Sequence, residues 1–419
     1  CMFPEGRITS NGNMGEFKRG FLRMLPDDID VPIVPLHLGL VWGSIFSRSH
    51  GDVKLRRPRA VPYPVTISFG PALERNVSPM QARFAVSELA TQAECEPSPG
   101  ERCLPSEFIR KARWSPRLRV VQDSTGASSR YAGLLINSLA LARVLKRETG
   151  EKEAHIGILL PPSVGAVKVA LGVMIADQIP VFLNYTASAD AIEHAIEKCA
   201  IRRLYTSAEM IEKLPAKFPQ LLEVEDVASR VTIGDKLAAT VMAITPLRWL
   251  ERRWYPTHAD STNNPATVLF SSGSTGMPKG VVLTHNNLYS NMNTAVRMLD
   301  VRGDDVFLGI LPFFHSFGFL MTLWLPLCWG VRVVYHNNPV DAARIGELCE
   351  NKDVSLIMAT PTFLQAYIRK CTPEQFDRLR LVITGAEKLR ADVRDHFSEK
   401  FGIVPIEGYG CTELSPIVS

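Results

Sequence analysis

The sequence lacks the patterns that mark disulfide-bonded, zinc-binding or nucleic-acid-binding proteins. Its eight cysteines are scattered, with no CxxC pair and no histidine at metal-ligand spacing. This usage favours reduced thiols over a disulfide framework or a zinc site. The formal net charge of +4 over 419 residues is too small to indicate a nucleic-acid partner.

Long apolar runs are also scarce. The longest covers residues 317–334 and is interrupted by Pro326 and Arg332, whereas a membrane-spanning helix needs about 20 predominantly apolar residues. We therefore expect a buried helix followed by a strand, and a chain that is soluble or peripheral to a membrane. No signal peptide opens the chain. Because the chain begins inside one motif and stops just after another, we expect it to be a fragment.

Hydrophobic residues make up 46% of the chain and charged residues 21%, enough apolar side chains to bury substantial cores. A Pro/Gly/Glu-rich stretch at 94–107 has the composition of a linker. We predict one domain over 1–95, a linker over 96–106 and a second domain over 107–419.

Beyond this stretch, short apolar runs alternate with helix-length amphipathic runs. Strands are expected at 155–161 and 179–185, and helices at 164–178 and 190–200. The alternation returns after residue 266 and predicts an α/β fold with parallel-rich sheets flanked by helices. Ligands of such folds bind in loops at the carboxyl ends of strands.

The segment SSGSTGMPKG, Ser271 to Gly280, follows the apolar strand TVLF. Its hydroxyl residues and three glycines let a backbone approach phosphates closely, and Lys279 adds a positive charge. A P-loop is excluded because the GxxxxGK[ST] spacing is absent and Gly280 follows the lysine. A Ser/Gly-rich surface turn remains the alternative.

This segment resembles the phosphate-binding signature of the adenylate-forming superfamily, which includes acyl-CoA synthetases, luciferases and nonribosomal peptide adenylation domains. Downstream, LPFFHSFG (311–318), TPTFL (360–364), TGAEKL (384–389) and EGYGCTE (407–413) follow in that family's order. The resemblance implies ATP and Mg²⁺ as cofactors and a carboxylate that attacks the α-phosphorus.

The resemblance also assigns roles residue by residue. Lys279 would hold the β- and γ-phosphates, Thr412 the α-phosphate and Glu413 the Mg²⁺, while His315 would orient the acid at the mouth of its pocket. Together with Lys279, the implied nucleotide-binding residues are Ser271, Ser272, Gly273, Ser274, Thr275, Gly276, Gly385, Ala386, Glu387, Gly408, Tyr409, Gly410 and Thr412. The alternatives are a solvated loop acid for Glu413 and an ordinary histidine bonded to backbone for His315.

The amino-terminal FPEG (3–6), followed by VPIVP (31–35), resembles motifs of lysophospholipid and glycerol-phosphate acyltransferases. In that family Glu5, Gly6 and Arg7 would shape the site for a phosphorylated acceptor, although here Arg7 directly follows Gly6. A strand end with a Pro-Glu-Gly turn is the alternative. The family's HxxxxD pair is expected upstream of residue 1. The match from His336 to Asp341 lies in the wrong domain, and Asp341 is expected to cap a helix.

The combination resembles the bifunctional acyl-[acyl-carrier-protein] synthetase/2-acylglycerophosphoethanolamine acyltransferase family. It implies activation of a fatty acid, transfer to acyl-carrier protein or coenzyme A, and acylation of a lysophospholipid. The implied location is peripheral, at the cytoplasmic face of the inner membrane. The family's late catalytic lysine is expected beyond residue 419, so we expect this chain to be inactive alone. A standalone carboxylate-activating ligase and a non-catalytic nucleotide- or lipid-binding regulator remain alternatives.

The segment KLAATVMAITPLRWLERRWY (236–255) is apolar and ends in arginines and tryptophans. Such mixtures suit a membrane surface. An ordinary packed helix with a solvated basic end is the alternative.

Overall fold

The computed structural model describes residues 1–7, 9, 14–24, 31–39, 41, 65–95, 102–149, 153–271 and 276–418. These residues form two compact units, each treated by itself below. The first comprises Cys1–Glu101 with Asn293–Val301, and the second comprises Arg102–Met292 with Arg302–Ser419. The predicted domain division at 96–106 remains a prediction.

The described part of the first unit contains a two-stranded antiparallel sheet and two helices. Leu36 pairs with Phe69 in this sheet, and Gly39 pairs with Thr66. Its elements are α1 (Gly20–Arg23), β1 (Leu36–Gly39), β2 (Thr66–Phe69) and α2 (Pro79–Cys95). Arg83 of α2 donates hydrogen bonds to the carbonyl oxygens of Met14 and Gly15, which ties the amino-terminal segment to the helix.

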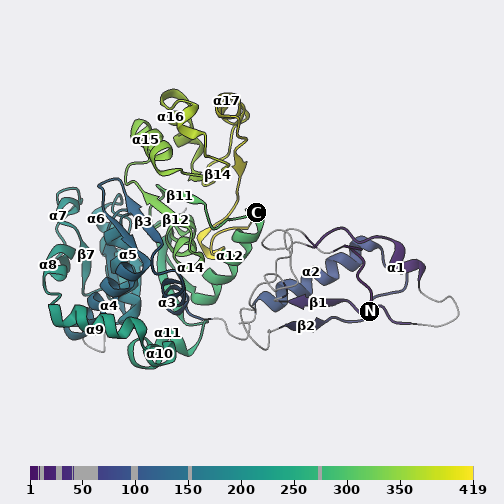
Figure 1. Cartoon of the computed structure of the whole chain (residues 1–419), viewed down its shortest axis with the longest axis horizontal. Coiled ribbons are helices and arrows are strands. Elements are labelled where there is room, and N and C mark those ends of the chain that lie inside the picture. The colour runs from purple at the N-terminus through teal and green to yellow at the C-terminus, as the bar shows by residue number, and fades with distance from the viewer. Residues whose placement is uncertain are drawn as a thin grey trace. The chain divides into compact units, whose positions relative to one another are not determined.

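The second unit contains two sheets. In the six-stranded sheet, with order β10-β9-β6-β5-β7-β8, every pair is parallel except β9 with β10. Its strands are β5 (His155–Leu159), β6 (Ile179–Phe182), β7 (Leu204–Thr206), β8 (Leu221–Glu223), β9 (Pro265–Ser271) and β10 (Lys279–Thr284). The helices α6 (Ala189–Lys198), α7 (Ala208–Ile211) and α8 (Val224–Ser229) lie near β7 (Figure 1).

The seven-stranded sheet has the order β15-β14-β13-β11-β12-β3-β4 and is parallel except for β3 with β4. Its strands are β3 (Arg119–Asp123), β4 (Ser128–Arg130), β11 (Val306–Gly309), β12 (Arg332–Tyr335), β13 (Leu356–Ala359), β14 (Leu381–Thr384) and β15 (Ile406–Glu407). Helices α15 (Ala342–Lys352), α16 (Pro361–Lys370) and α17 (Ala391–Phe401) gather near β14 in Figure 1.

The remaining helical segments are α3 (Leu104–Trp114), α4 (Tyr131–Glu148), α5 (Val164–Ile175), α9 (Ile233–Ile244), α10 (Leu247–Trp254), α11 (Pro256–Asp260), α12 (His285–Met298), α13 (Ser316–Gly318), the π-helix η1 (Phe319–Trp324), α14 (Leu325–Trp329) and the 3₁₀ turns η2 (Glu374–Phe376) and η3 (Thr412–Leu414). The α/β fold with parallel-rich sheets is thereby confirmed.

Helix starts follow from local chemistry, because small polar side chains satisfy the free N–H groups of a first turn. Ser163 caps α5, Ser188 caps α6 and Thr360 caps α16. Asp341 accepts a hydrogen bond from the N–H of Arg344 and caps α15, as predicted. The imidazole of His336 lies 3.7 Å from the Asp341 carboxylate and bonds the hydroxyl of Ser124 at 2.8 Å.

The longest apolar run forms a buried helical segment followed by a strand, as predicted. It comprises α13, η1 and α14 and leads into β12, and Phe319, Leu323 and Leu327 have no exposed surface. Among the described residues, no helix is both long and apolar enough to cross a membrane.

Two buried histidines connect the starts of α3 and α12 to α11 and to the residue before β6. The N–H of Leu104 donates to Nδ1 of His285 at 3.3 Å, so Nε2 of His285 carries the proton and donates to Nδ1 of His258 at 2.9 Å. Nε2 of His258 then donates to the carbonyl oxygen of Gln178 at 3.0 Å. Each bond is satisfied only when both rings are neutral.

Burial lowers the pKa of His285, and the neighbouring His258 adds to that shift; burial likewise lowers the pKa of His258. The unfolded chain then binds more protons than the folded chain below the ordinary histidine pKa of 6.5. The stability that these two histidines contribute should therefore be complete above this pH. The free energy of unfolding should fall as the pH drops toward their two lowered pKa values. Urea unfolding at a series of pH values measures this slope.

His258→Gln should flatten part of this slope and cost about 1–3 kcal/mol at pH 8, since it disturbs a buried hydrogen-bond chain. The exposed His396 provides a matched control, because His396→Gln removes a histidine without disturbing the buried chain of hydrogen bonds. A slope that is the same in wild type and in His258→Gln would contradict the assignment.

Candidate functional site

The glycine-rich segment connects two antiparallel strands. Ser271 ends β9 and pairs with Lys279, the first residue of β10, and the Ser271 hydroxyl donates to the Lys279 carbonyl oxygen at 3.5 Å. A P-loop leads from a strand into a helix, so the hairpin agrees with the exclusion of that motif. Gly276 has φ +148°, a conformation that side-chain-bearing residues rarely adopt. The predicted phosphate-binding residues Ser272, Gly273, Ser274 and Thr275 lie outside the described residues.

His315 lies in the loop after β11 and is the residue before α13. Phe313 and Phe314 beside it are buried, and the rings of Phe314 and His315 are 4.6 Å apart between centroids. Partial burial lowers the pKa of His315, although part of the residue remains exposed. The imidazole is therefore neutral at pH 7, which suits orientation of a substrate better than charge neutralisation.

Gly318 lets this loop fold back on itself. A Cβ atom at this position would lie 2.4 Å from the carbonyl oxygen of Pro312 and 2.8 Å from that of Leu311. The turn that presents His315 therefore requires glycine at its end.

The predicted nucleotide-binding residues Gly385, Ala386 and Glu387 follow β14 and contact the loops of neighbouring strands. The N–H of Gly385 donates to the carbonyl oxygen of Ala359 at 3.3 Å, and Ala386 has φ +68°. The carboxylate of Glu387 accepts a hydrogen bond of 2.7 Å from the hydroxyl of Thr362 in α16. A Cβ atom on Gly385 would lie 3.6 Å from the carbonyl oxygen of Gly408.

The segment after β15 is bonded back onto the same edge. The N–H of Gly408 donates to the carbonyl oxygen of Thr384 at 2.8 Å. Tyr409 is exposed. Gly410 has no room for a side chain, because a Cβ atom would lie 2.0 Å from the carbonyl oxygen of Pro416. The segment therefore carries an exposed aromatic residue directly after Gly408, whose carbonyl oxygen lies near Gly385.

Thr412 and Glu413 lie in η3, which packs beside β10, the strand that starts at Lys279. The Thr412 hydroxyl lies 3.4 Å from the hydroxyl of Ser316, next to His315. The side chain of Asn291 in α12 bonds both backbone groups of Ile417, just after η3. The structure thus brings Thr412 together with the His315 loop and places η3 beside β10.

These residues fit ATP and Mg²⁺. Glu413 is exposed, and no group of three or more His, Cys, Asp or Glu side chains in the described ranges could hold a metal ion. Mg²⁺ commonly binds one or two carboxylates and takes its other ligands from water and phosphates. Glu413 would suffice as the protein's contribution if a nucleotide supplied the rest.

Three polar residues of this edge were not predicted as site residues: Ser316, Thr362 and Asn291. Ser316 and Thr362 lie inside the motifs at 311–318 and 360–364, so their position in the sequence could have identified them as site residues. Asn291 lies in an amphipathic helix, and its contact with Ile417 across the sequence has no local signature.

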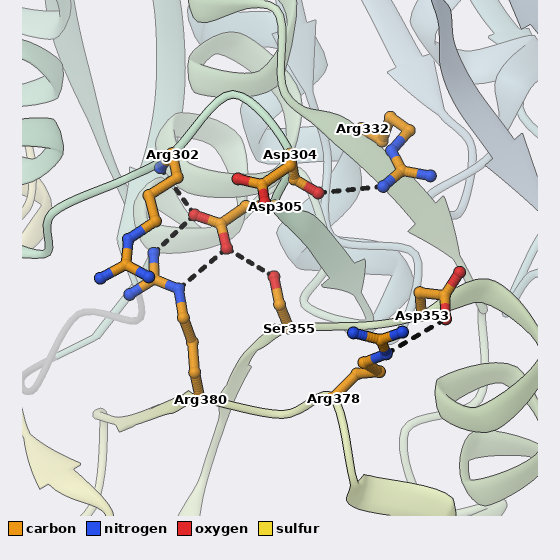
Figure 2. A pocket seen from close by; sticks show the side chains of 8 residues that line it. All are labelled: Arg302, Asp304, Asp305, Arg332, Asp353, Ser355, Arg378 and Arg380. Atoms are coloured by element: carbon orange, nitrogen blue, oxygen red, sulfur yellow. Dashed lines mark hydrogen bonds and ion pairs between the residues drawn. The ribbon is translucent and has the colours of Figure 1, made fainter. Parts of the chain in front are cut away.

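A separate pocket lies at the opposite edge of the seven-stranded sheet, before the amino ends of β11, β12, β13 and β14. Figure 2 shows Arg380 and Ser355 directed at the carboxylate of Asp305, at 2.9 Å and 2.7 Å. Burial raises the pKa of Asp305, but hydrogen bonds from Arg380, Ser355 and the N–H of Arg302 outweigh it and lower the pKa. This charge network holds three strand starts together and lies away from the predicted site.

In the first unit, Phe3 to Gly6 form a turn closed by the Gly6 N–H on the Phe3 carbonyl oxygen at 3.1 Å, and Gly6 has φ +65°. The Glu5 carboxylate accepts a 2.7 Å hydrogen bond from the N–H of Gly15. Arg7 is exposed. The predicted acceptor site at these residues remains a prediction.

The sequence pattern of the AMP-binding enzyme family matches residues 108–419. A probable 4-coumarate–CoA ligase 3 of Dictyostelium discoideum is 27% identical over 337 residues, which cover 75% of this chain and 61% of the relative. The medium-chain fatty-acid–CoA ligase of Escherichia coli is 25% identical over 328 residues, covering 76% and 56%.

Among solved structures, ATP-bound MatB from Rhodopseudomonas palustris has a TM-score of 0.62 at 22% identity, covering 75% of this chain and 60% of that one. This likeness shows the fold. The matched region spans about three fifths of the length of these curated relatives.

Replacing Gly318 by alanine should disrupt the His315 loop, because the new Cβ would collide with two carbonyl oxygens. We expect a loss of about 1–3 kcal/mol in the free energy of unfolding, measured by urea denaturation. Gly303→Ala is the control, because no atom lies within 4 Å of a Cβ at that position. Equal midpoints for the two variants would contradict the packing argument.

Proposed function

Because the chain belongs to the AMP-binding enzyme family, we propose that it activates a carboxylic acid with ATP as an acyl-adenylate, for transfer to a thiol. The observation that carries this proposal is the meeting of η3, the His315 loop and the Gly385 loop at one edge of the second sheet. That edge offers hydroxyls, backbone donors and a neutral histidine, and η3 packs beside β10, the strand that starts at Lys279.

The chain's own residues divide the work of the reaction. The Thr412 hydroxyl donates to the α-phosphate where charge develops as the carboxylate attacks, which is the largest kind of electrostatic contribution to such reactions. Lys279 neutralises the leaving pyrophosphate. The neutral His315 orients the acid without competing for its negative charge. When bound at Glu413, Mg²⁺ supplies further charge neutralisation on the phosphates.

We propose a fatty acid as the substrate and acyl-carrier protein or coenzyme A as the thiol. The buried Phe313 and Phe314 beside His315 support an acid with an apolar tail. The relatives are named as CoA ligases and include both a fatty-acid and an aromatic-acid ligase. A CoA ligase for another carboxylate is therefore the second candidate.

We further propose that the first unit belongs to an acyltransferase that passes the acyl group to a lysophospholipid, at the cytoplasmic face of the inner membrane. The support is the resemblance of FPEG and VPIVP to acyltransferase motifs, together with the Phe3–Gly6 turn and the exposed Arg7 that follows it. An arginine at that position offers the fork of donors that a phosphate binds.

Glu413→Ala in the full-length protein should lower fatty-acid-dependent exchange of ³²P-pyrophosphate into ATP by about a hundredfold or more, since transition-state charge loses its neutralisation. Glu399, an exposed acid in α17, gives the matched control, and Glu399→Ala should exchange at the wild-type rate. Wild-type protein that shows no exchange with any fatty acid or aromatic acid would refute the ligase proposal.

Arg7→Ala should lower transfer of an acyl group to lysophosphatidylethanolamine by about tenfold or more, because a charged hydrogen-bond partner of the phosphate is lost. The same variant should retain pyrophosphate exchange. Arg19→Ala, at another exposed arginine of the first unit, is the control and should retain both. If wild-type protein exchanges pyrophosphate but never acylates the lysolipid, the acyltransferase proposal fails and the ligase proposal stands.

A further inference from the structure

Helix α9 is anchored through its charged side. Asp235 is buried and accepts hydrogen bonds from Arg143 at 3.0 Å and from Arg147 at 2.9 and 3.0 Å, both in α4. The same carboxylate closes a capping box with Thr232. Asp235, Ala239 and Met242 are the buried residues of the helix, so the side that faces the protein is fixed by an ion-pair network.

The opposite side of α9 is apolar and faces outward. Ile233, Leu237, Val241 and Ile244 follow one another at helical spacing, and each is between 60% and 81% exposed. A surface helix of a globular protein normally turns such a stripe toward the core. A contiguous exposed stripe of large aliphatic side chains is typical of an interaction surface.

The next helix along the chain, α10, carries exposed basic side chains and a tryptophan. Arg248, Trp249, Arg252 and Arg253 line a shallow pocket, and all four are exposed. Lys236 adds a further exposed positive charge on α9.

Exposed negative charge is absent between Arg230 and Trp254, a stretch that the structure describes in full. Of its two acidic residues, Asp235 is buried, and Glu251 is only partly exposed and accepts a 2.8 Å hydrogen bond from Ser106. In Figure 1, α9 and α10 run along the same lower edge of the second unit. The exposed apolar stripe of α9 and the exposed basic residues and Trp249 of α10 are together called here the α9–α10 face.

We propose that the α9–α10 face docks onto a lipid bilayer that contains anionic headgroups. The aliphatic side chains would enter the boundary between headgroups and acyl chains, Trp249 would lie at the headgroup level, and the arginines would contact lipid phosphates. Charge complementarity selects an anionic lipid surface as the occupant. This proposal rests on the proposed function, since a fatty acid and a lysophospholipid both partition into the bilayer.

Vesicle flotation tests the proposal without requiring catalysis. The purified full chain is mixed with vesicles of phosphatidylethanolamine and phosphatidylglycerol, or of phosphatidylcholine alone, in the absence of ATP and acid. Wild-type protein should float with the anionic vesicles and float much less with phosphatidylcholine. The double variant Arg252→Glu/Arg253→Glu should bind the anionic vesicles about tenfold more weakly or worse. Each basic residue near an anionic surface contributes substantially to the free energy of membrane binding.

A second pair of changes tests the apolar stripe. Leu237→Glu/Val241→Glu places charges at two exposed positions and should abolish flotation, while Val340→Glu/Val404→Glu changes two exposed valines elsewhere in the second unit and should float like wild type. For the arginines, Arg369→Glu/Lys370→Glu is the matched control, because these exposed basic residues also end a helix. Pyrophosphate exchange, measured without vesicles in the full-length protein, should be unchanged in every variant.

Equal flotation of wild type and the α9–α10 variants would overturn the proposal, as would wild-type protein that stays unbound with both kinds of vesicle. A wild-type dimer that Leu237→Glu/Val241→Glu converts to a monomer, seen by light scattering, would assign the face to a second copy instead. Wild-type protein that floats with the anionic vesicles but shows no pyrophosphate exchange would refute the proposed function and leave the membrane surface standing.

Discussion

The parallel alignment of β11, β13, β14 and β15 is the constraint on which the rest of the site depends. These neighbouring strands all end at one edge, so the loops that follow them meet even though they are far apart in the sequence. The amino ends of β11, β13 and β14 are held by the buried carboxylate of Asp305 with Arg380 and Ser355. Electrostatics on one edge therefore maintain the register that positions hydroxyls and backbone donors on the other.

Much of the second unit's fold was predictable because its signals are local. Alternating apolar runs of strand and helix length predicted β5, α5, β6 and α6, and a polar residue before an amphipathic run predicted the Asp341 cap. The glycine-rich segment was correctly separated from a P-loop by spacing alone, and the structure shows it as a hairpin connection. Motif order was sufficient to place most candidate residues in loops after strands.

Other features depend on contacts between distant segments and had no local signal. The Ser316–Thr412 and Thr362–Glu387 contacts join motifs separated by whole strand–helix units. The segment at 236–255 was predicted to suit a membrane surface, but its orientation depends on where Arg143 and Arg147 place Asp235. The roles of the motif residues toward ATP, and of Glu5 and Arg7, follow from resemblance and remain proposals.

The chain of hydrogen bonds through His258 and His285 also bears on how this fold can change over evolutionary time. Each ring is the hydrogen-bond partner of the other, so loss of one leaves a buried polar atom without a hydrogen bond. Replacing both by apolar residues of similar shape can leave the stability nearly unchanged. Replacing the two histidines one at a time, in either order, therefore passes through a less stable protein that keeps only one of them. We therefore expect descendants of this sequence to keep the pair intact or to replace it as a unit.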